Sequence, residues 1–530
     1  MAPKILVSPQ RLFALLILSG YLMTSRDASA QATPAKPDYS GESFVIEQLK
    51  DEVAFNDDGT GQEDQVARIR IQSEAGVQRF GVLSFSYRNE RDRLEIVQIR
   101  VHKPDSSIVD TPESNVQDLP ADVTREAPTY SDLHEKQIPV KALGVGDTLE
   151  WHTRTVHVKT DAAGHFWYTH DFIKDAIVIE QSLQITAPAG KFVKVSSPDL
   201  KPEIREAGGR KTYSWKTSNL SHPKEEDNEK KIRPRVRPQP AVQLTTFRSW
   251  EELGRWYAEL QKPKVEVTPA IQAKMAELTA NLKTDAEKER ALYRFVASNF
   301  RYISISFGEG WYQPHAAAEV LANQYGDCKD KHTLLATLLK AAGIEAWPAL
   351  IGAGNTVDPD VPSPGQFNHV ITYLPRGNGA FLDSTAEIAP FGMLTSAVRE
   401  QHALVIPDQG VPALKDTPDG SLFPNEETVT IQSKLNSEGT LTGDFEIVLR
   451  GDDELVLRSV FHTTAPKDWS TLAQNLSKGM GYAGTVRDLH VSNPVDTSGP
   501  FRFSYKYERK NYSDWDNRRI TPPVPPLSFK

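Results

Sequence analysis

The chain has 530 residues, more than one hydrophobic core usually holds, which predicts several domains. With 39% apolar and 25% charged residues, its composition is that of an ordinary globular protein. The net charge of −9 argues against nucleic acid as the main partner, because phosphate binding requires a strongly basic surface.

Residues 1–30 have the pattern of a cleavable export signal. Lys4 supplies a basic start, and an apolar run extends from Leu12 to Met23. This run is shorter than the roughly 20 residues that a membrane-spanning helix needs. The small-x-small sequence from Ala28 to Ala30 predicts cleavage before Gln31 and a periplasmic or secreted protein. An uncleaved membrane anchor is the alternative.

Residues 42–220 are predicted to form an N-terminal β-sandwich-like domain. Apolar and polar residues alternate here in short runs that are separated by turn residues, as is typical of antiparallel strands. Clear examples are ARIRIQ (67–72), LEWHTRT (149–155) and SLQIT (182–186). His165 and His170 lie close together in this region, but two histidines without a third ligand do not predict a metal site.

A charged, Pro-rich stretch at residues 221–242 predicts a linker. Helix signals follow within residues 243–410, where Ser249, Thr268 and Thr284 are expected N-caps. A further helix is expected near Pro314, and strands are expected in FNHVITYL (367–374) and AFLDST (380–385).

Residues 420–530 return to a period of two and are predicted to form a C-terminal β-rich domain. Their strongest strand, FRFSYKYE, places four aromatic side chains on one face: Phe501, Phe503, Tyr505 and Tyr507. The chain ends in ITPPVPPLSFK without a capping element, so we expect this domain to be incomplete.

The single cysteine, Cys328, lies at the predicted start of a helix. Asp327 is a good N-cap residue, and the helix should run to about Ala342. The first turn of a helix favours negative charge and hence a thiolate, and Lys329 and Lys331 should add positive potential. A lone thiol in an exported protein cannot form an internal disulfide, so it is either buried and inert or chemically used.

His369 is expected to be the group that activates this thiol. If the segment between the two strands forms a hairpin centred on Arg376 or Gly377, His369 and Asp383 become direct or diagonal neighbours on one face. A carboxylate beside an imidazole fixes its tautomer and stabilises the imidazolium, and the imidazole can then accept the thiol proton.

The order of a helix-borne cysteine, a strand histidine and an aspartate on the next strand resembles the transglutaminase-like superfamily. The segment YGDCKDKHTLLATLLKAAGIEAWPALI is similar to its nucleophile segment, and FNHVITYL and FLDST are similar to its His and Asp segments. The layout also resembles a bacterial envelope group with an N-terminal β-domain of unknown function. The resemblance implies an α+β fold, with a papain-like core of helices on an antiparallel sheet and β-sandwich-like domains on either side.

From the resemblance, Cys328 is the nucleophile, His369 the base and Asp383 the orienting acid. The candidate oxyanion or substrate residues are the backbone N–H of Cys328 and the side chains of Trp311, Tyr312 and Gln313. For Trp311 and Tyr312, a purely structural role in the core is the alternative.

A zinc site and a calcium site are two less favoured interpretations of the residues in this region. Cys328 and His332 are four residues apart on one helix, but only the distant His315 and His369 could complete a zinc site. The run DPDVPSPG (358–365) lacks the ordered spacing of calcium ligands and is expected to be a loop over the cleft. No cofactor and no metal are therefore expected.

The sequence predicts a cysteine enzyme that acts on peptide or carboxamide bonds through a thioester. Resolution by water would make it a peptidase or amidase, and resolution by an amine would make it an acyltransferase. Its expected partners are a protein or peptide substrate and a component of the cell envelope. The alternative is a non-catalytic envelope scaffold, because the fold alone does not establish activity.

Overall fold

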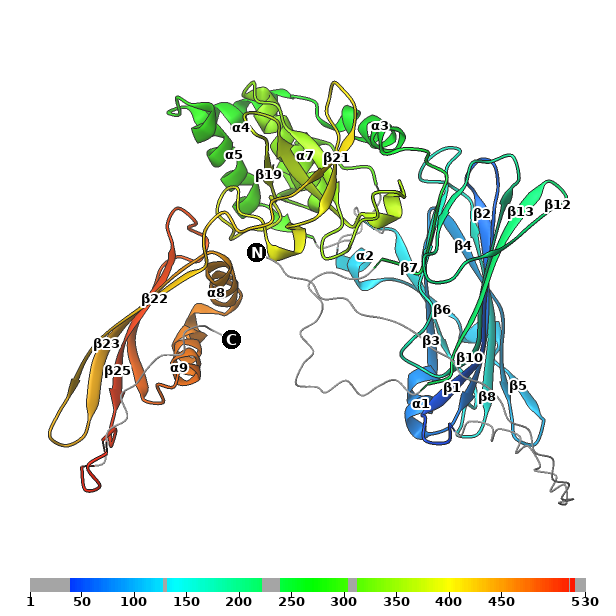
Figure 1. The fold of residues 1–530 in the computed structure, drawn as a ribbon, viewed down its shortest axis with the longest axis horizontal. Helices are drawn as coiled ribbons and strands as arrows, with labels where there is room; N and C mark the ends of the chain where they lie inside the picture. The colour runs from blue at the N-terminus through cyan, green and yellow to red at the C-terminus, as the bar shows by residue number, and fades with distance from the viewer. Residues whose placement is uncertain (1–38, 127–130, 222–238, 304–311, 514, 520–530) are drawn as a thin grey trace, which may run out of the picture. The chain divides into compact units, whose positions relative to one another are not determined.

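The N-terminal part of the chain is built on an eight-stranded sheet (Figure 1). The structure is a computed structural model that describes residues 39–126, 131–221, 239–303, 312–513 and 515–519. In sheet order the strands are β12 (Glu203–Ala207), β13 (Arg210–Asn219), β10 (Val178–Pro188), β1 (Phe44–Phe55), β2 (Gly61–Ile71), β8 (Thr148–His157), β4 (Asp92–His102) and β5 (Ile108–Asp110). All neighbours are antiparallel except β1 and β10, which run parallel.

The predicted alternation in this sheet is confirmed. Ala67, Ile69 and Ile71 of β2 are buried, and Leu149 and Trp151 of β8 join them in one apolar cluster. Alternate residues of a strand point to the same face, so a period of two places all of these side chains in the core. The flanking domain is therefore rich in β-structure, as expected.

Two three-stranded sheets complete this region. One contains β3 (Val82–Arg88), β7 (Leu133–Pro139) and β6 (Gln117–Pro120), with the short helices α1 (Glu74–Phe80) and α2 (Asp122–Glu126) nearby in the chain. The other contains β11 (Lys194–Ser196), β14 (Val242–Thr245) and β9 (Trp167–His170). Val242 and Leu244 are fully buried and pair β14 with β9, so the chain rejoins the N-terminal sheets at the last residue of the predicted linker.

Five α-helices then form the helical layer of the core: α3 (Trp250–Gln261), α4 (Pro269–Thr279), α5 (Asp285–Asn299), α6 (Ala317–Asn323) and α7 (Cys328–Ala341). Ser249, Thr268 and Thr284 cap α3, α4 and α5 as predicted, each accepting a hydrogen bond from a backbone N–H of the first turn. The two-residue strands β15 (Arg301–Tyr302) and β16 (Tyr325–Gly326) pair directly before the start of α7.

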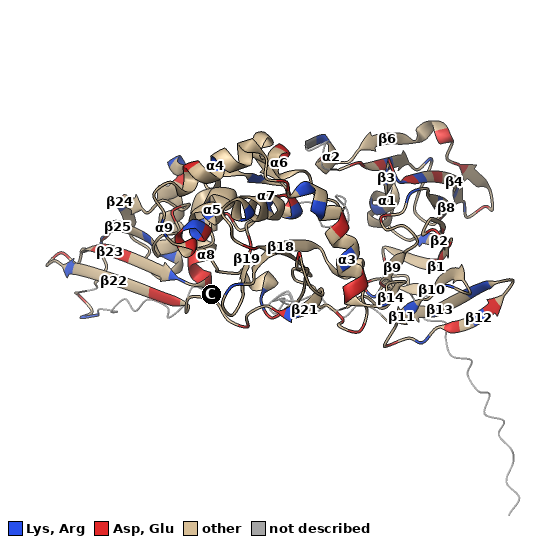
Figure 2. Ribbon diagram, turned by 90° about the horizontal axis from the view of Figure 1, so that it is seen from above, with Lys and Arg blue, Asp and Glu red and all other residues tan. Residues whose placement is uncertain are grey.

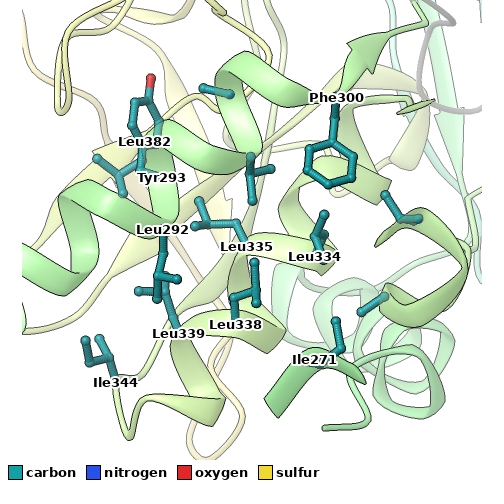
Figure 3. Close-up of a cluster of buried hydrophobic side chains, with 14 of the residues drawn as sticks. Ile271, Leu292, Tyr293, Phe300, Leu334, Leu335, Leu338, Leu339, Ile344 and Leu382 are labelled. Atoms are coloured by element: carbon teal, nitrogen blue, oxygen red, sulfur yellow. The ribbon is translucent and has the colours of Figure 1, made fainter. Parts of the chain in front are cut away.

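A five-stranded antiparallel sheet lies against α7. Its order is β19 (Ala380–Leu382), β18 (His369–Leu374), β17 (Trp347–Ile351), β20 (His402–Val405) and β21 (Ala413–Asp416). Every residue of α7 from Cys328 to Leu339 is buried. Figure 3 shows the apolar contacts that hold the helix, formed by side chains of α4, α5, α7 and the sheet: Ile271, Leu292, Tyr293, Leu334, Leu335, Leu338, Leu339 and Leu382.

The C-terminal region is a four-stranded antiparallel sheet with two helices. The strands are β22 (Glu426–Leu435), β23 (Leu441–Arg450), β25 (Phe501–Arg509) and β24 (Thr485–Val491), and the aromatic face predicted on β25 is buried. The period-two pattern does not predict the helices α8 (Asp452–Thr463) and α9 (Trp469–Gly479), which lie along this sheet (Figure 1). Leu457 and Phe461, four residues apart on α8, pack into the sheet's core.

Charged residues of both signs occur throughout the helices and sheets (Figure 2). In the part of the chain that the structure describes, no helix has the length and apolar character needed to cross a bilayer.

Candidate active site

Cys328 is the first residue of α7, and its start is fixed by a capping box. The Asp327 carboxylate accepts a hydrogen bond from the Asp330 N–H at 3.2 Å, and the Asp330 carboxylate accepts one from the Asp327 N–H at 3.4 Å. The Cys328 side chain is only 1% exposed. The thiol therefore lies at the positive end of a buried helix, where a negative charge is favoured.

His369 and Asp383 lie at the start of β18 and just beyond the end of β19. Their side chains are joined by a hydrogen bond of 3.0 Å between His369 Nε2 and Asp383 Oδ2. The imidazole also interacts with the side chain of Cys328, which helps to raise the pKa of His369. Because His369 Nε2 is hydrogen-bonded to Asp383, Nδ1 is the ring nitrogen that remains for the thiol.

The hairpin register explains this contact. Thr372 pairs with Leu382, and Leu374 with Ala380, so the hairpin is centred on Gly377, the second of the two predicted centres. Extended by three residues, this register sets position 385 opposite His369 and makes Asp383 its diagonal neighbour.

The charges of the pair stabilise each other within a buried site. Burial by itself lowers the pKa of His369, but the negative charges of Asp383 and Cys328 and their hydrogen bonds raise it well above its usual value. Burial raises the pKa of Asp383, but the positive charge of His369 and the hydrogen bonds from His369 and Thr385 lower it overall. The favoured state is thus an imidazolium held by a carboxylate.

Thr385 is a supporting residue that the sequence analysis does not identify. Its hydroxyl donates to Asp383 Oδ1 at 2.6 Å, and its backbone N–H donates to the same atom at 3.0 Å. Tyr293 of α5 donates its hydroxyl to the backbone carbonyl of Asp383 at 3.0 Å. The Asp-Ser-Thr sequence carries a usable signal, because an aspartate often accepts the N–H two residues later in a tight turn.

Residues 272–360 match the transglutaminase-like superfamily, and residues 57–224 match a family described as a domain of unknown function (DUF3857). The chain therefore contains a transglutaminase-like domain. The matched segment includes Cys328 and ends before His369 and Asp383. No curated protein sequence matches the chain.

A crystal structure of a "putative protease" from Parabacteroides distasonis has the same fold as this chain. Its TM-score is 0.61 at 13% identity, with 88% of this chain and 93% of that chain covered. A "putative cysteine protease" from Cytophaga hutchinsonii has a TM-score of 0.20 at 14% identity and covers 47% of this chain and 78% of its own. An M1 zinc metallopeptidase from Deinococcus radiodurans has a TM-score of 0.21 at 8% identity and covers 38% of this chain and 42% of its own. At these TM-scores, the last two structures do not indicate a shared fold.

The lysines of the transglutaminase-like nucleophile segment are buried in the structure. The Lys329 ammonium forms an ion pair with Asp327, and Lys331 donates to the carbonyls of Ala297 and Phe300 at 3.0 and 2.9 Å. The Lys331 bonds satisfy the C-terminal end of α5, so this amine fastens α5 to α7. Burial lowers the pKa of Lys331 to about 8.

The three side chains expected near the oxyanion differ in their positions. Trp311 lies outside the described residues. Tyr312 is buried and packs edge-on against Trp167 and Trp256, with ring centroids 5.5 and 5.2 Å away. Gln313 is exposed and donates to the carbonyl of Leu260 at 3.4 Å.

The histidines considered as zinc ligands have other partners. His332 contacts Gln261 Nε2 through its own Nε2 at 2.9 Å and Thr372 Oγ1 through Nδ1 at 2.8 Å. His315 contacts the Asp330 carboxylate at 3.2 Å. Within the described ranges, no group of three or more Cys, His, Asp or Glu side chains could hold a metal ion.

A cavity of about 390 Å³ reaches the His369 side of the site. Apart from the histidine and aspartate, it is lined by uncharged residues: Tyr302, Ala353, Asn368, Thr385, Ala386, Thr395, Ala397 and Val398. Residues 358–365, the expected loop over the cleft, are not among them. That loop is fastened elsewhere, by bonds from Trp250 Nε1 to the Pro359 carbonyl (2.7 Å) and from Thr245 Oγ1 to the Pro362 carbonyl (2.8 Å).

Another cavity, of about 430 Å³, lies between α3 and the C-terminal half of α7. Its lining includes none of Cys328, His369 and Asp383. For the chemistry of the transglutaminase-like domain, the smaller cavity at His369 is the relevant one.

Proposed function

We propose that the transglutaminase-like domain is a cysteine enzyme that cleaves a peptide or carboxamide bond through a thioester on Cys328. The observation that carries the proposal is that His369 interacts with Cys328 and forms a hydrogen bond with Asp383. A nucleophile, a base and a group that orients the base are the parts that covalent acyl transfer requires.

In the first half of the reaction, the Cys328 thiolate attacks the carbonyl carbon and forms a carbon–sulfur bond. The carbonyl oxygen becomes an oxyanion, which the backbone N–H of Cys328 at the start of α7 can stabilise. The carbon–nitrogen bond then breaks, and the His369 imidazolium gives its proton to the departing amine. Asp383 stabilises the imidazolium before this transfer.

In the second half, the neutral His369 removes a proton from the incoming nucleophile. Water yields a free acid, and a primary amine yields a new amide. The carbon–sulfur bond breaks in either case, and the thiolate returns. The uncharged lining of the cavity at His369 favours a neutral acyl group over a strongly charged one.

The second candidate is a non-catalytic envelope scaffold with an intact but unused site. It is favoured by the 1% exposure of Cys328 and by the absence of Cys328 from the lining of the cavity at His369. We also propose that the protein is exported, which is supported by the sequence pattern of residues 1–30.

One experiment separates the enzyme from the scaffold. The purified chain is incubated with a library of peptides and carboxamides, and the reaction is quenched in acid. The mass of the intact protein is then measured by mass spectrometry. The enzyme should carry an acyl increment on Cys328, and Cys328→Ser should lose turnover while keeping its circular dichroism spectrum. If no substrate gives an adduct and iodoacetamide does not react with the wild-type thiol, the scaffold is the correct interpretation.

A further inference from the structure

The C-terminal end of α3 meets α7 through two contacts. Gln261, the last residue of α3, meets His332 at 2.9 Å, and the carbonyl of Val265, just beyond α3, accepts a hydrogen bond from Lys340 at 3.5 Å. Both contacts place the C-terminal end of α3 and the residues after it against α7.

Tyr257 and Cys328 share one buried environment. Tyr257 lies one turn before Gln261 on α3, and Cys328 lies one turn before His332 on α7. Residues four apart lie on the same face of a helix, so Tyr257 lies on the face of α3 that carries Gln261, and Cys328 lies on the face of α7 that carries His332. Both side chains belong to one apolar cluster, with exposures of 0% for Tyr257 and 1% for Cys328.

We propose that the Tyr257 hydroxyl is a side-chain donor of the oxyanion hole, acting together with the backbone N–H of Cys328. This inference rests on the proposed acyl-transfer function. The hydroxyl donates a hydrogen bond to the carbonyl oxygen as that oxygen becomes negative in the tetrahedral intermediate. It gives up no proton, and every bond change in the reaction remains with Cys328 and His369.

The electrostatics suit a donor that keeps its proton. Burial raises the pKa of Tyr257 well above its usual value, and the negative charges of Cys328, Asp327 and Asp330 raise it further. The phenol is therefore neutral at working pH and already lies among negative charges. A neutral donor in a buried site stabilises a developing oxyanion without a cost of reorganisation.

Tyr312 and Gln313 are poorer candidates, because both have other contacts. Tyr312 packs between the rings of Trp167 and Trp256, and Gln313 is exposed and bonded to Leu260. Tyr257 differs in that it lies in one buried cluster with Cys328 and on the face of α3 that contacts α7 through Gln261.

Two electrophiles with different transition states test this role in the full-length protein. Acylation by p-nitrophenyl acetate passes through an oxyanion, whereas alkylation by iodoacetamide displaces iodide and forms none. In Tyr257→Phe, the acylation rate of Cys328 should fall by about 10²-fold, as for loss of one oxyanion donor, while alkylation changes by less than about threefold. Tyr505→Phe, which removes a buried phenol from β25, is the matched control and should change neither rate.

Equal effects of Tyr257→Phe on both rates, or no effect on either, would overturn the inference and leave the proposed function standing. Failure of the wild-type thiol to react with either reagent would overturn the proposed function itself. If Tyr257→Phe does not fold, a crystal structure of the wild-type chain with a peptide aldehyde on Cys328 decides the matter. A hemithioacetal oxygen within hydrogen-bond distance of the Tyr257 hydroxyl supports the role, and one beyond about 4 Å contradicts it.

Discussion

His332 Nδ1 lies 2.8 Å from Thr372 Oγ1, and this contact ties the helix of Cys328 to the strand of His369. The amide nitrogen of Gln261 can only donate, so it donates to His332 Nε2, and Nδ1 carries the proton that is donated to Thr372. Only a neutral imidazole can make both contacts. His332 is one turn from Cys328, and Thr372 is three residues from His369, so the bridge helps to set the distance between thiol and imidazole.

Replacing His332 by Gln should reduce the acid sensitivity of this region. Burial lowers the pKa of His332 to about 3. The unfolded chain, with a histidine pKa of about 6.5, binds a proton that the folded state does not bind. The free energy of unfolding therefore falls by about 1.4 kcal/mol per pH unit below pH 6.5. Hydrogen exchange of the α7 amides, corrected for intrinsic rates, measures the free energy of unfolding of this helix. Its decrease between pH 6.5 and 5 should be about 2 kcal/mol smaller in His332→Gln than in wild type.

The same substitution should lower stability at neutral pH by about 1–3 kcal/mol, because Thr372 and Gln261 lose a buried partner. The control for the pH slope is His490→Gln, which changes an exposed histidine. An identical pH slope in His332→Gln and wild type would contradict the neutral, buried imidazole.

Replacing Asp383 by Asn should lower the pKa of His369 to below the ordinary histidine value. The carboxylate is the strongest of the influences that raise this pKa, and without its charge the desolvation that lowers it dominates. Histidine Cε1 chemical shifts, titrated in chains labelled on histidine, measure the change, with His369→Ala assigning the signal. Turnover should fall strongly with the fold retained. A His369 pKa that stays high in Asp383→Asn would mean that the carboxylate is not the main cause.

Replacing Thr385 by Val should weaken turnover by about tenfold, since one hydrogen bond to a charged group is worth about 1.5 kcal/mol or more. Without the hydroxyl at 2.6 Å, the pKa of Asp383 rises, and the acid limb of the pH–rate profile should move to higher pH. Thr385→Ser keeps the hydroxyl and is expected to retain the wild-type profile. Equal losses in both variants would point to packing of the Thr385 methyl group.

Water, rather than an amine, should resolve the thioester. Water is in great excess, so free acid should exceed amide when a labelled primary amine is supplied at millimolar concentration. Chromatography of the two products gives their ratio. Predominant incorporation of the amine would instead assign the domain to cross-linking.

Processing of the N-terminus should give a mature chain that begins at Gln31. The reason is the small-x-small motif that ends at Ala30, after an apolar run too short to span a bilayer. Edman sequencing of protein recovered from the cell envelope or medium checks this. A recovered chain that still carries the Leu12 to Met23 run would favour the membrane anchor.

The sequence by itself determined the elements whose signals are local. The Asp327 cap, the start of α7 at Cys328, the period-two burial of β2 and β8 and the aromatic face of β25 all follow from residues a few positions apart. Side-chain direction in a helix or strand depends on the backbone period, and a cap depends on one turn, so no distant contact is needed to predict them. The hairpin between β18 and β19 was predictable for the same reason, to within one residue of its centre.

Only the tertiary structure decided which side chains meet across the core. The bridge from Gln261 through His332 to Thr372, the Lys331 bonds to the end of α5 and the shared buried cluster of Tyr257 and Cys328 join segments far apart in the chain. A lysine or histidine in a helix has the same local pattern whether it faces solvent or a buried partner. Its environment is set by the packing of whole elements, which a sequence period does not encode.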